Sequence, residues 1–340
     1  MQHGNKQEPT RRTMLRAGAV AGTATGLSAA GILGARAANA TATSAPGESR
    51  KPPPYPPDVT DASRCTPEVA ALFHRIFTAK SEHDTAAFMA HFSRSNTSYS
   101  DACLGVVMSG WQAINTGFTS IFTSAPADAI AYPLTIVGDT NSATVEFVDS
   151  PGFFGQEIRA LSSVTFDRDR KITRWVDYWD RRSSLFPSPD AGAYPADFHD
   201  SEQNADPAVV HAATRLQSAF AAGDAAAAAA LMSVDVVHED MAAHTRVRGQ
   251  VQVQRYYTRA LRHLPYGPGA ALLHTEGSRQ GGGYEWSTSP AAAPGRRGHT
   301  AIGLDAVGRI NRLITVYDSS LLSYPAYLSL VGLAAEAPLS

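Results

Sequence analysis

The residues best suited to chemistry stand two positions apart in two runs of the sequence: Tyr99 with Asp101, and Asp177 between Trp175 and Trp179. Alternate side chains of a strand share one face, so each run places its members side by side. A carboxylate between two indoles is partly desolvated, which raises its pKa and makes it a better general base near neutral pH. A phenol beside a carboxylate can hold one water molecule or one substrate oxygen. The alternative for Asp177 is a solvated strand end paired with an arginine.

An internal repeat helps to separate functional residues from structural ones. The offset is 139 residues between Asp101 and Asp240 and 138 between Asp180 and Asp318. Residues kept in both copies are expected to serve the fold, whereas polar residues of one copy are candidates for function. The polar candidates that change in the second copy are Tyr99 (His238), Asp149 (Thr288) and Asp177 (Thr315). Because Asp101 is matched, a structural role remains its alternative.

The elements that must position these residues follow one order in both copies, helices first and strands afterwards. In the first copy we expect helices from 67, from 84 and over 111–122, and strands over 96–101, 131–137, 143–149, 156–166 and 171–180. In the second copy we expect helices over 209–221, 224–232 and 251–264, and strands near 236–240, 270–276, 283–288, 297–304 and 309–318. Three helices on one face of a curved antiparallel sheet give an α+β fold with a pocket between the layers.

Composition divides the chain further. Residues 41–63 form a proline-rich tether and 187–206 a linker, which leaves domains over 64–186 and 207–322 and an apolar tail over 323–340. Residues 1–40 carry Arg11-Arg12, a mildly apolar run to Gly34 and a small-x-small site ending at Ala40. This segment resembles a twin-arginine export signal. The alternative is a basic tail before a membrane helix, but the run is too short and too rich in Gly and Thr.

Charge and composition exclude several classes of function. The chain has 340 residues, 44% of them hydrophobic, and a formal charge of −2, which argues against nucleic acid as a partner. Removal of residues 1–40 takes away five positive charges and one negative, so the exported chain is mildly acidic. We expect export from the cytoplasm and no stable membrane insertion afterwards. The sequence lacks CxxC and HExxH spacings, so we expect neither a metal site nor a cofactor.

The chain has two cysteines, Cys65 and Cys103. They are expected to form a disulfide or to be two small buried residues.

The order of elements and the run Ile172-Thr-Arg-Trp-Val-Asp-Tyr-Trp-Asp180 give the chain a specific resemblance. It is similar to the nuclear transport factor 2 superfold, and within it to the SnoaL-like and limonene-epoxide-hydrolase-like families. The resemblance implies two tandem cone-shaped domains. Since this fold often pairs through its open sheet, it also implies an internal pseudo-dimer.

The epoxide-hydrolase resemblance implies a role for each candidate. Asp177 would be the base, Tyr99 with Asp101 would hold the water, and Asp149 would be the acid. The position of the arginine that joins the two carboxylates is occupied by Phe147. In the SnoaL-like cyclases and ketosteroid isomerases the same pocket uses a carboxylate to take a proton from carbon.

Together these features predict an exported, cofactor-independent acid–base enzyme for an apolar small molecule such as a polyketide, terpenoid or steroid. Its first domain would be active as an epoxide hydrolase or as an isomerase or cyclase, with Trp175, Trp179 and Phe147 lining the substrate pocket. Arg159 and Arg174 are the arginines that could replace the missing one. The second domain would be degenerate. The alternative, motivated by Phe147, is a non-catalytic extracellular binding protein for an apolar ligand.

Overall fold

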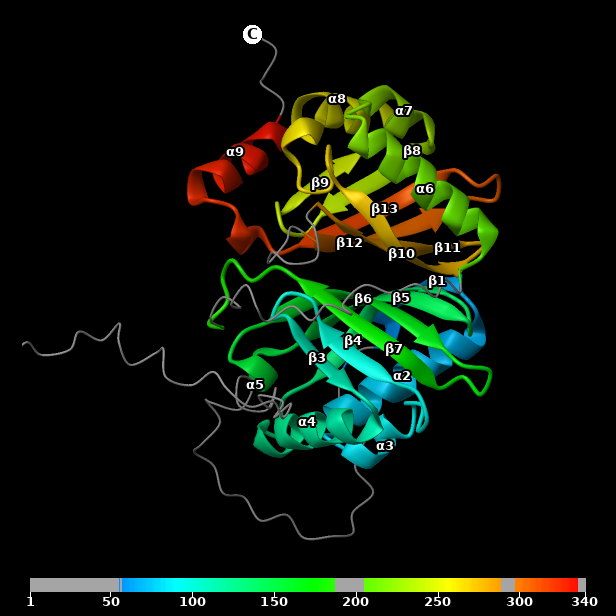
Figure 1. Ribbon diagram of the computed structural model, residues 1–340, viewed down its shortest axis with the longest axis vertical. Helices are drawn as coiled ribbons and strands as arrows, with labels where there is room; N and C mark the ends of the chain where they lie inside the picture. Colours follow the sequence, from blue (N-terminus) through cyan, green and yellow to red (C-terminus); the bar gives the residue numbers. More distant parts are fainter. Residues whose placement is uncertain (1–54, 56, 187–204, 289–296, 336–340) are drawn as a thin grey trace, which may run out of the picture.

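The computed structural model describes residues 55, 57–186, 205–288 and 297–335. The predicted export signal and most of the predicted tether and linker lie outside these residues. Each half of the described chain is α+β, and its helices cover one face of a mixed sheet (Figure 1).

The first half contains a seven-stranded sheet with the strand order β1-β4-β5-β6-β7-β2-β3. Its helices are η1 (Pro57–Val59), α2 (Pro67–Ser81), α3 (Thr85–Met89), α4 (Trp111–Ser124) and α5 (Pro151–Phe154). Its strands are β1 (Asp61–Cys65), β2 (Ser98–Asp101), β3 (Val106–Ser109), β4 (Ala131–Gly138), β5 (Ser142–Asp149), β6 (Ile158–Phe166) and β7 (Ile172–Trp179).

The second half contains a six-stranded sheet with the order β10-β11-β12-β13-β8-β9. Its helices are α6 (Pro207–Ala221), α7 (Ala225–Ala230), α8 (Gln250–Ala260), η2 (Leu261–His263), η3 (Ser319–Leu321) and α9 (Tyr324–Ala334). Its strands are β8 (Met232–Asp240), β9 (Thr245–Arg248), β10 (Ala271–Ser278), β11 (Gly281–Ser287), β12 (Arg297–Leu304) and β13 (Ile310–Tyr317).

The expectation of purely antiparallel sheets is wrong. β2 pairs with β7 in parallel, and β8 pairs with β13 in the same way, because the chain crosses the sheet between the early strand and the last one. β1 adds a further parallel strand beside β4. The strand β1 begins inside the stretch 41–63, so the end of the predicted tether is part of the sheet.

Local sequence signals account for the helix ends. The Asp84 side chain accepts from the Ala87 N–H at 2.9 Å and so caps α3, as the sequence predicts. Gly110 and Gly249 precede α4 and α8 with φ values of 84° and 89°. This backbone conformation favours glycine, which explains why both copies keep one there.

The helix-covered faces of the sheets bury the two main apolar cores, and the opposite faces of the sheets contact each other. Leu161 and Val176 of the first sheet pack against Ile314 and Val316 of the second. Figure 1 shows the resulting order of layers, with helices outermost on both sides.

Buried charges also join the two sheets. The Arg174 guanidinium donates to both carboxylate oxygens of Glu285, at 2.6 and 3.1 Å, and Tyr178 donates to Glu285 at 2.7 Å. Glu276 accepts from Thr144 at 2.7 Å. The two halves therefore share a contact that is both apolar and ionic.

The remaining segments qualify three expectations. Cys65 and Cys103 are both free thiols, so the disulfide alternative does not hold here. The predicted tail contains α9, whose Leu330 packs into the second core, while Arg182 of the first half stacks on Tyr327 at 4.1 Å. No helix within the described residues combines the length and the hydropathy that a membrane crossing requires.

Candidate functional site

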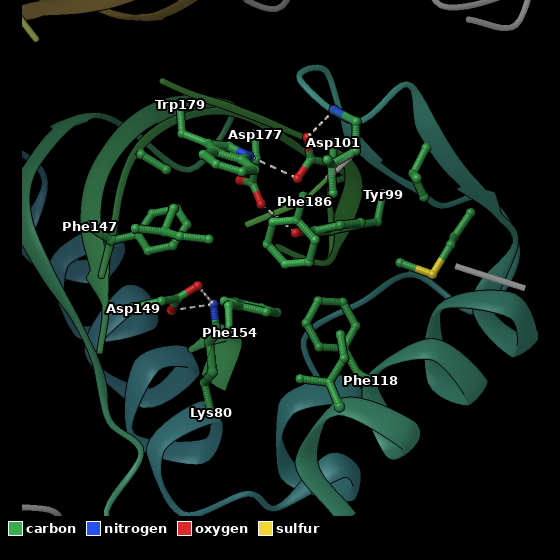
Figure 2. A pocket seen from close by; sticks show the side chains of 16 residues that line it. Lys80, Tyr99, Asp101, Phe118, Phe147, Asp149, Phe154, Asp177, Trp179 and Phe186 are labelled. Carbon is green, nitrogen blue, oxygen red and sulfur yellow. Dashed lines mark hydrogen bonds and ion pairs between the residues drawn. The ribbon is translucent and has the colours of Figure 1, made fainter. Parts of the chain in front are cut away.

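A cavity lies between the first sheet and the helices that cover it, as Figure 2 shows. Its volume is about 40 Å³, enough for a few water molecules. Most of its wall is apolar, and its polar groups are four charged or acidic side chains and one phenol. The residues that line it are Lys80, Tyr99, Asp101, Leu104, Val106, Met108, Phe118, Ile121, Phe147, Asp149, Phe154, Ile158, Ala160, Asp177, Trp179 and Phe186.

Asp177 has three hydrogen-bond donors and is buried at 5% exposure. Tyr99 donates to one oxygen of its carboxylate, and Ser162 donates to the other. The Trp175 indole N–H donates to the same oxygen as Ser162, at 2.5 Å. The register explains this set, because Asp101 of β2 and Ser162 of β6 both pair directly with Asp177. Donors on both oxygens hold the carboxylate in one orientation.

Trp175 does not line the cavity, contrary to expectation. Its ring packs behind the cavity wall against Phe73 at 6.0 Å and Phe77 at 6.4 Å between centroids, and only its N–H is directed to Asp177. Phe147 and Trp179 do line the cavity.

Asp101 combines a structural role with a place in the cavity wall. Its Oδ1 accepts from the backbone N–H groups of Cys103 and Leu104 at 2.9 and 2.8 Å. Asp240 makes the same kind of bond to Ala243, which accounts for an aspartate in both copies. The second oxygen of Asp101 accepts from the Trp179 indole at 2.9 Å, at the edge of the cavity.

Lys80 is a charged cavity residue that the sequence patterns do not single out. Its Nζ lies 2.6 Å from Oδ1 and 2.9 Å from Oδ2 of Asp149, and both side chains are buried. A signal was present, since Lys80 follows Ile76 by four residues and Phe77 by three, on the apolar face of its helix. The corresponding residue of α6 is Phe220, so Lys80, like Asp177, is a polar residue that the second copy does not keep.

Neither arginine proposed as a replacement reaches the cavity. Arg174 binds Glu285 across the sheet contact. Arg159 pairs with Glu146 and, at 2.8 Å, with Glu239 of the second half. Lys80 therefore supplies the positive charge of the cavity.

Burial dominates the electrostatics of the cavity. It raises the pKa of Asp177, although the hydrogen bonds from Ser162, Tyr99 and Trp175 and the charge of Lys80 act in the opposite direction. Burial also raises the pKa of Asp149, against the lowering effect of Lys80.

Two further groups have raised pKa values. Burial and the charge of Asp177 raise the pKa of Asp101 to about 7. The same two causes raise the pKa of the Tyr99 phenol well above its usual value, so Tyr99 remains a hydrogen-bond donor. Acidic groups with raised pKa values thus share the cavity.

The second half lacks this arrangement. Thr315 takes the place of Asp177, since it pairs with Asp240 and Thr300 as Asp177 pairs with Asp101 and Ser162. The equivalent interior is occupied by buried aromatic side chains, among them Tyr256, Tyr257, Tyr266, Tyr284, Trp286 and Tyr317. Burial lowers the pKa of His238, the counterpart of Tyr99, to about 3.

A potential metal-ligand group lies outside the cavity. Ligand atoms of His274, Glu276 and Glu285 lie within 4.8 Å of one another. They belong to the contact between the sheets, where the guanidinium of Arg174 already neutralises Glu285. This set is better explained as an ionic contact between the two halves.

No protein-family model matches the chain, and no curated protein matches it. Solved structures do match about a third of it. A SnoaL-like protein of unknown function from Burkholderia thailandensis is 16% identical, with 34% of this chain and 97% of that chain covered and a TM-score of 0.29. An NTF2-like protein of unknown function from Cytophaga hutchinsonii is 12% identical, with 33% and 89% covered and a TM-score of 0.28. A protein from Sinorhizobium meliloti, provisionally named a polyketide cyclase, is 25% identical, with 33% and 94% covered and a TM-score of 0.28.

Proposed function

We propose that the first half is a cofactor-independent acid–base enzyme with Asp177 as its general base. The observation that carries the proposal is the buried Asp177 carboxylate on an apolar cavity, held by Tyr99, Ser162 and Trp175. Burial makes the carboxylate more basic, and fixed donors keep it aimed while it accepts a proton. The second copy has Thr315 in its place and an interior filled by aromatic rings.

Proton transfer at carbon, as in an isomerase or cyclase, is the reaction class that this geometry favours. Asp177 takes a proton from a carbon next to a carbonyl group and returns it to another atom of the same molecule. A substrate that fills this mostly apolar cavity displaces water, which strengthens the electrostatic interactions within it. Epoxide hydrolysis is the second candidate, and the buried pair of Asp149 with Lys80 is the observation that favours it.

An apolar small molecule of the polyketide, terpenoid or steroid kind fits the wall chemistry. The cavity itself holds only a few water molecules, so such a substrate requires the aromatic rings at its edge to move. Phe154 and Phe186 are only partly buried and contact each other with ring centroids 6.1 Å apart. We expect these two side chains to admit the substrate.

Mass spectrometry after incubation in heavy-oxygen water tests this proposal. Residues 41–340 and the Asp177→Asn variant would be incubated with a panel of terpenoid and polyketide enones and epoxides. A rearranged, unlabelled product formed only by the unmutated protein supports the isomerase or cyclase. Heavy oxygen in a diol supports the hydrolase instead. Asp240→Asn, in the second half, is the control variant. Turnover at an unchanged rate in both Asp177→Asn and Asp240→Asn would exclude Asp177 as the base.

The alternative is a binding protein for an apolar ligand, motivated by a cavity wall in which Phe147 stands at the position of an arginine. Ligands extracted from the purified protein would then be recovered unaltered. Recovery of a transformed compound would contradict this alternative.

We also propose that the second half is the partner of an internal pseudo-dimer. The contact of the two sheets through Arg174, Glu285 and the apolar residues around Val176 supports this arrangement. Its role would be to cover the open face of the first sheet, on whose other face the cavity lies.

We further propose that the protein is exported by the twin-arginine route. Arg11 and Arg12, followed by a mildly apolar run, support this proposal. Replacement of both arginines by lysine should retain the full-length precursor in the cytoplasm. Processing at the same rate as before would contradict it.

A further inference from the structure

The buried pair of Lys80 and Asp149 stands on the same cavity as Asp177 but at the other side of it. Figure 2 shows Asp177 and Tyr99 along one wall and Lys80 with Asp149 along the facing one. All four residues line the cavity, and the charge of Lys80 acts on Asp177. A substrate in the cavity therefore lies between a base and a cation.

Lys80 has more contacts than its ion pair with Asp149 alone, and one of its N–H donors is not used by that pair. Its ammonium group lies 4.8 Å from the ring centroid of Phe147 and 5.7 Å from that of Phe153, so aromatic faces surround it. Within the described part of the chain, the hydrogen bonds of Nζ go to Asp149. An ammonium group has three N–H donors, and one carboxylate with two oxygens engages two of them. A third donor is left for a group in the cavity.

We propose that Lys80 is a catalytic residue that binds the oxygen of an enolate, and that the substrate is therefore an enolisable ketone or enone. This inference rests on the proposed role of Asp177. The Asp177 carboxylate removes a proton from the carbon next to the carbonyl group, and the C–H electron pair moves into a carbon–carbon double bond. The carbonyl oxygen becomes an oxyanion that accepts a hydrogen bond from Lys80. The oxyanion then re-forms the carbonyl group, and the enolate takes back the proton held by Asp177. A ketone is protonated at the original carbon, whereas an enone, through its conjugated double bond, is protonated at the γ carbon, so no oxidant or reductant is needed.

The charges of the cavity agree with this sequence of steps. When Asp177 gains the proton it becomes neutral, and the negative charge passes to the substrate oxygen on the side of Lys80. A preorganised cation in a low-dielectric site stabilises such a charge far better than it would in water. Asp149 holds the ammonium in position.

Equilibrium ionisation of a bound phenol tests the role of Lys80 without any knowledge of the substrate. 4-Nitrophenol carries its oxygen on an sp² carbon, as an enolate does, and its phenolate absorbs visible light. The Asp177→Asn variant mimics the protonated base and is the reference protein. The comparison protein is Asp177→Asn with Lys80→Met and Asp149→Asn, which removes both charges of the pair and leaves no unpaired buried charge.

We expect opposite results in the two proteins. In Asp177→Asn the apparent pKa of bound 4-nitrophenol should fall by about 1 or more relative to the free phenol, because a cation close by favours the phenolate. In the triple variant it should rise, because an apolar cavity disfavours the charged form. The double variant Asp177→Asn with Lys80→Arg keeps the positive charge, so the apparent pKa of bound 4-nitrophenol should still fall.

Two results would overturn the proposal: equal ionisation in the reference and triple variants, or no saturable binding of 4-nitrophenol to Asp177→Asn. The outcome is separable from the test of turnover. If Asp177→Asn abolishes turnover while the ionisation of the phenol is the same in both proteins, Asp177 stands as the base and Lys80 is a structural partner. If the ionisation differs as expected and no compound is turned over, Lys80 binds an oxyanion but the proposed enzyme activity is wrong.

Discussion

At the scale of single residues, the equivalent aspartates Asp101 and Asp240 have different surroundings in the two halves. Asp101 faces a cavity and accepts from an indole, whereas Asp240 is fully buried among tyrosines and accepts from Tyr266 and Tyr317 at 3.3 and 3.4 Å. In both cases burial is the first cause of a pKa raised to about 7. Asp101 lines the cavity, whereas Asp240 is enclosed by protein.

The raised pKa of Asp240 predicts a loss of stability with rising pH. The folded chain keeps the proton of Asp240 up to about pH 7, whereas the unfolded chain releases it near pH 4. Between these values the free energy of unfolding should decrease as the pH rises. The Asp240→Asn variant, which is neutral throughout, should reduce this decrease by an amount on the order of 4 kcal/mol. Urea unfolding at pH 4.5 and pH 8, chosen as roughly the ends of that window, measures this decrease in both proteins. An equal decrease in Asp240→Asn would show that Asp240 is not its cause.

At the scale of elements, the ion pair in the cavity fixes α2 against the end of β5. Lys80 stands in the last turn of α2 and Asp149 is the last residue of β5. Ser81 adds a second link, because its hydroxyl donates to the Ala131 carbonyl and accepts from the Ala131 N–H on the neighbouring strand β4. The helix thus carries both the cavity residue Lys80 and a second contact that holds α2 on the sheet.

A double-mutant cycle on Lys80 and Asp149 should show strong coupling. Lys80→Met leaves a buried carboxylate without its partner and should lower the free energy of unfolding by about 3–5 kcal/mol. Lys80→Met with Asp149→Asn removes both charges and should cost less than Lys80→Met alone. Urea unfolding of the unmutated protein, of Lys80→Met, of Asp149→Asn and of the double variant gives the coupling energy. Additive effects of the two single changes would mean that the pair contributes nothing to the position of α2.

Sequence patterns could predict the elements and one wall of the cavity but not the other wall. Asp177 and Tyr99 were found because strand alternation is local and because the repeat shows which residues change. Lys80 was missed because its partner Asp149 is 69 residues away and only the packing of α2 on the sheet brings them together. The parallel pairing of β2 with β7 was missed for the same reason, since strand order depends on contacts that no local pattern contains.

At the scale of the whole molecule, the sheet contact makes the two halves depend on each other. Arg174 and Glu285 are almost fully buried, with side-chain exposures of 10% and 2%. The charge of Arg174 and its hydrogen bonds lower the pKa of Glu285 far below its usual value, against the effect of burial. The Glu285 carboxylate is therefore ionised at neutral pH.

Loss of Arg174 should weaken the contact between the halves. Arg174→Met leaves Glu285 buried without its cation and should lower the free energy of unfolding by about 3–5 kcal/mol. Tryptophan fluorescence during urea unfolding measures the change, because Trp175 reports on the first half and Trp286 on the second. The matched control is Arg309→Met, whose pair with Asp305 is exposed to solvent, so its loss should change the free energy of unfolding little. Equal effects of the two substitutions would contradict the importance of the sheet contact.

The ionic contact between the sheets is not repeated by the internal symmetry. The counterparts of Arg174 and Glu285 are Arg312 and Glu146, yet Glu146 binds Arg159 instead. The sheet of each half therefore carries charges that the sheet of the other half neutralises. We expect neither half, expressed alone, to form this contact with a second copy of itself.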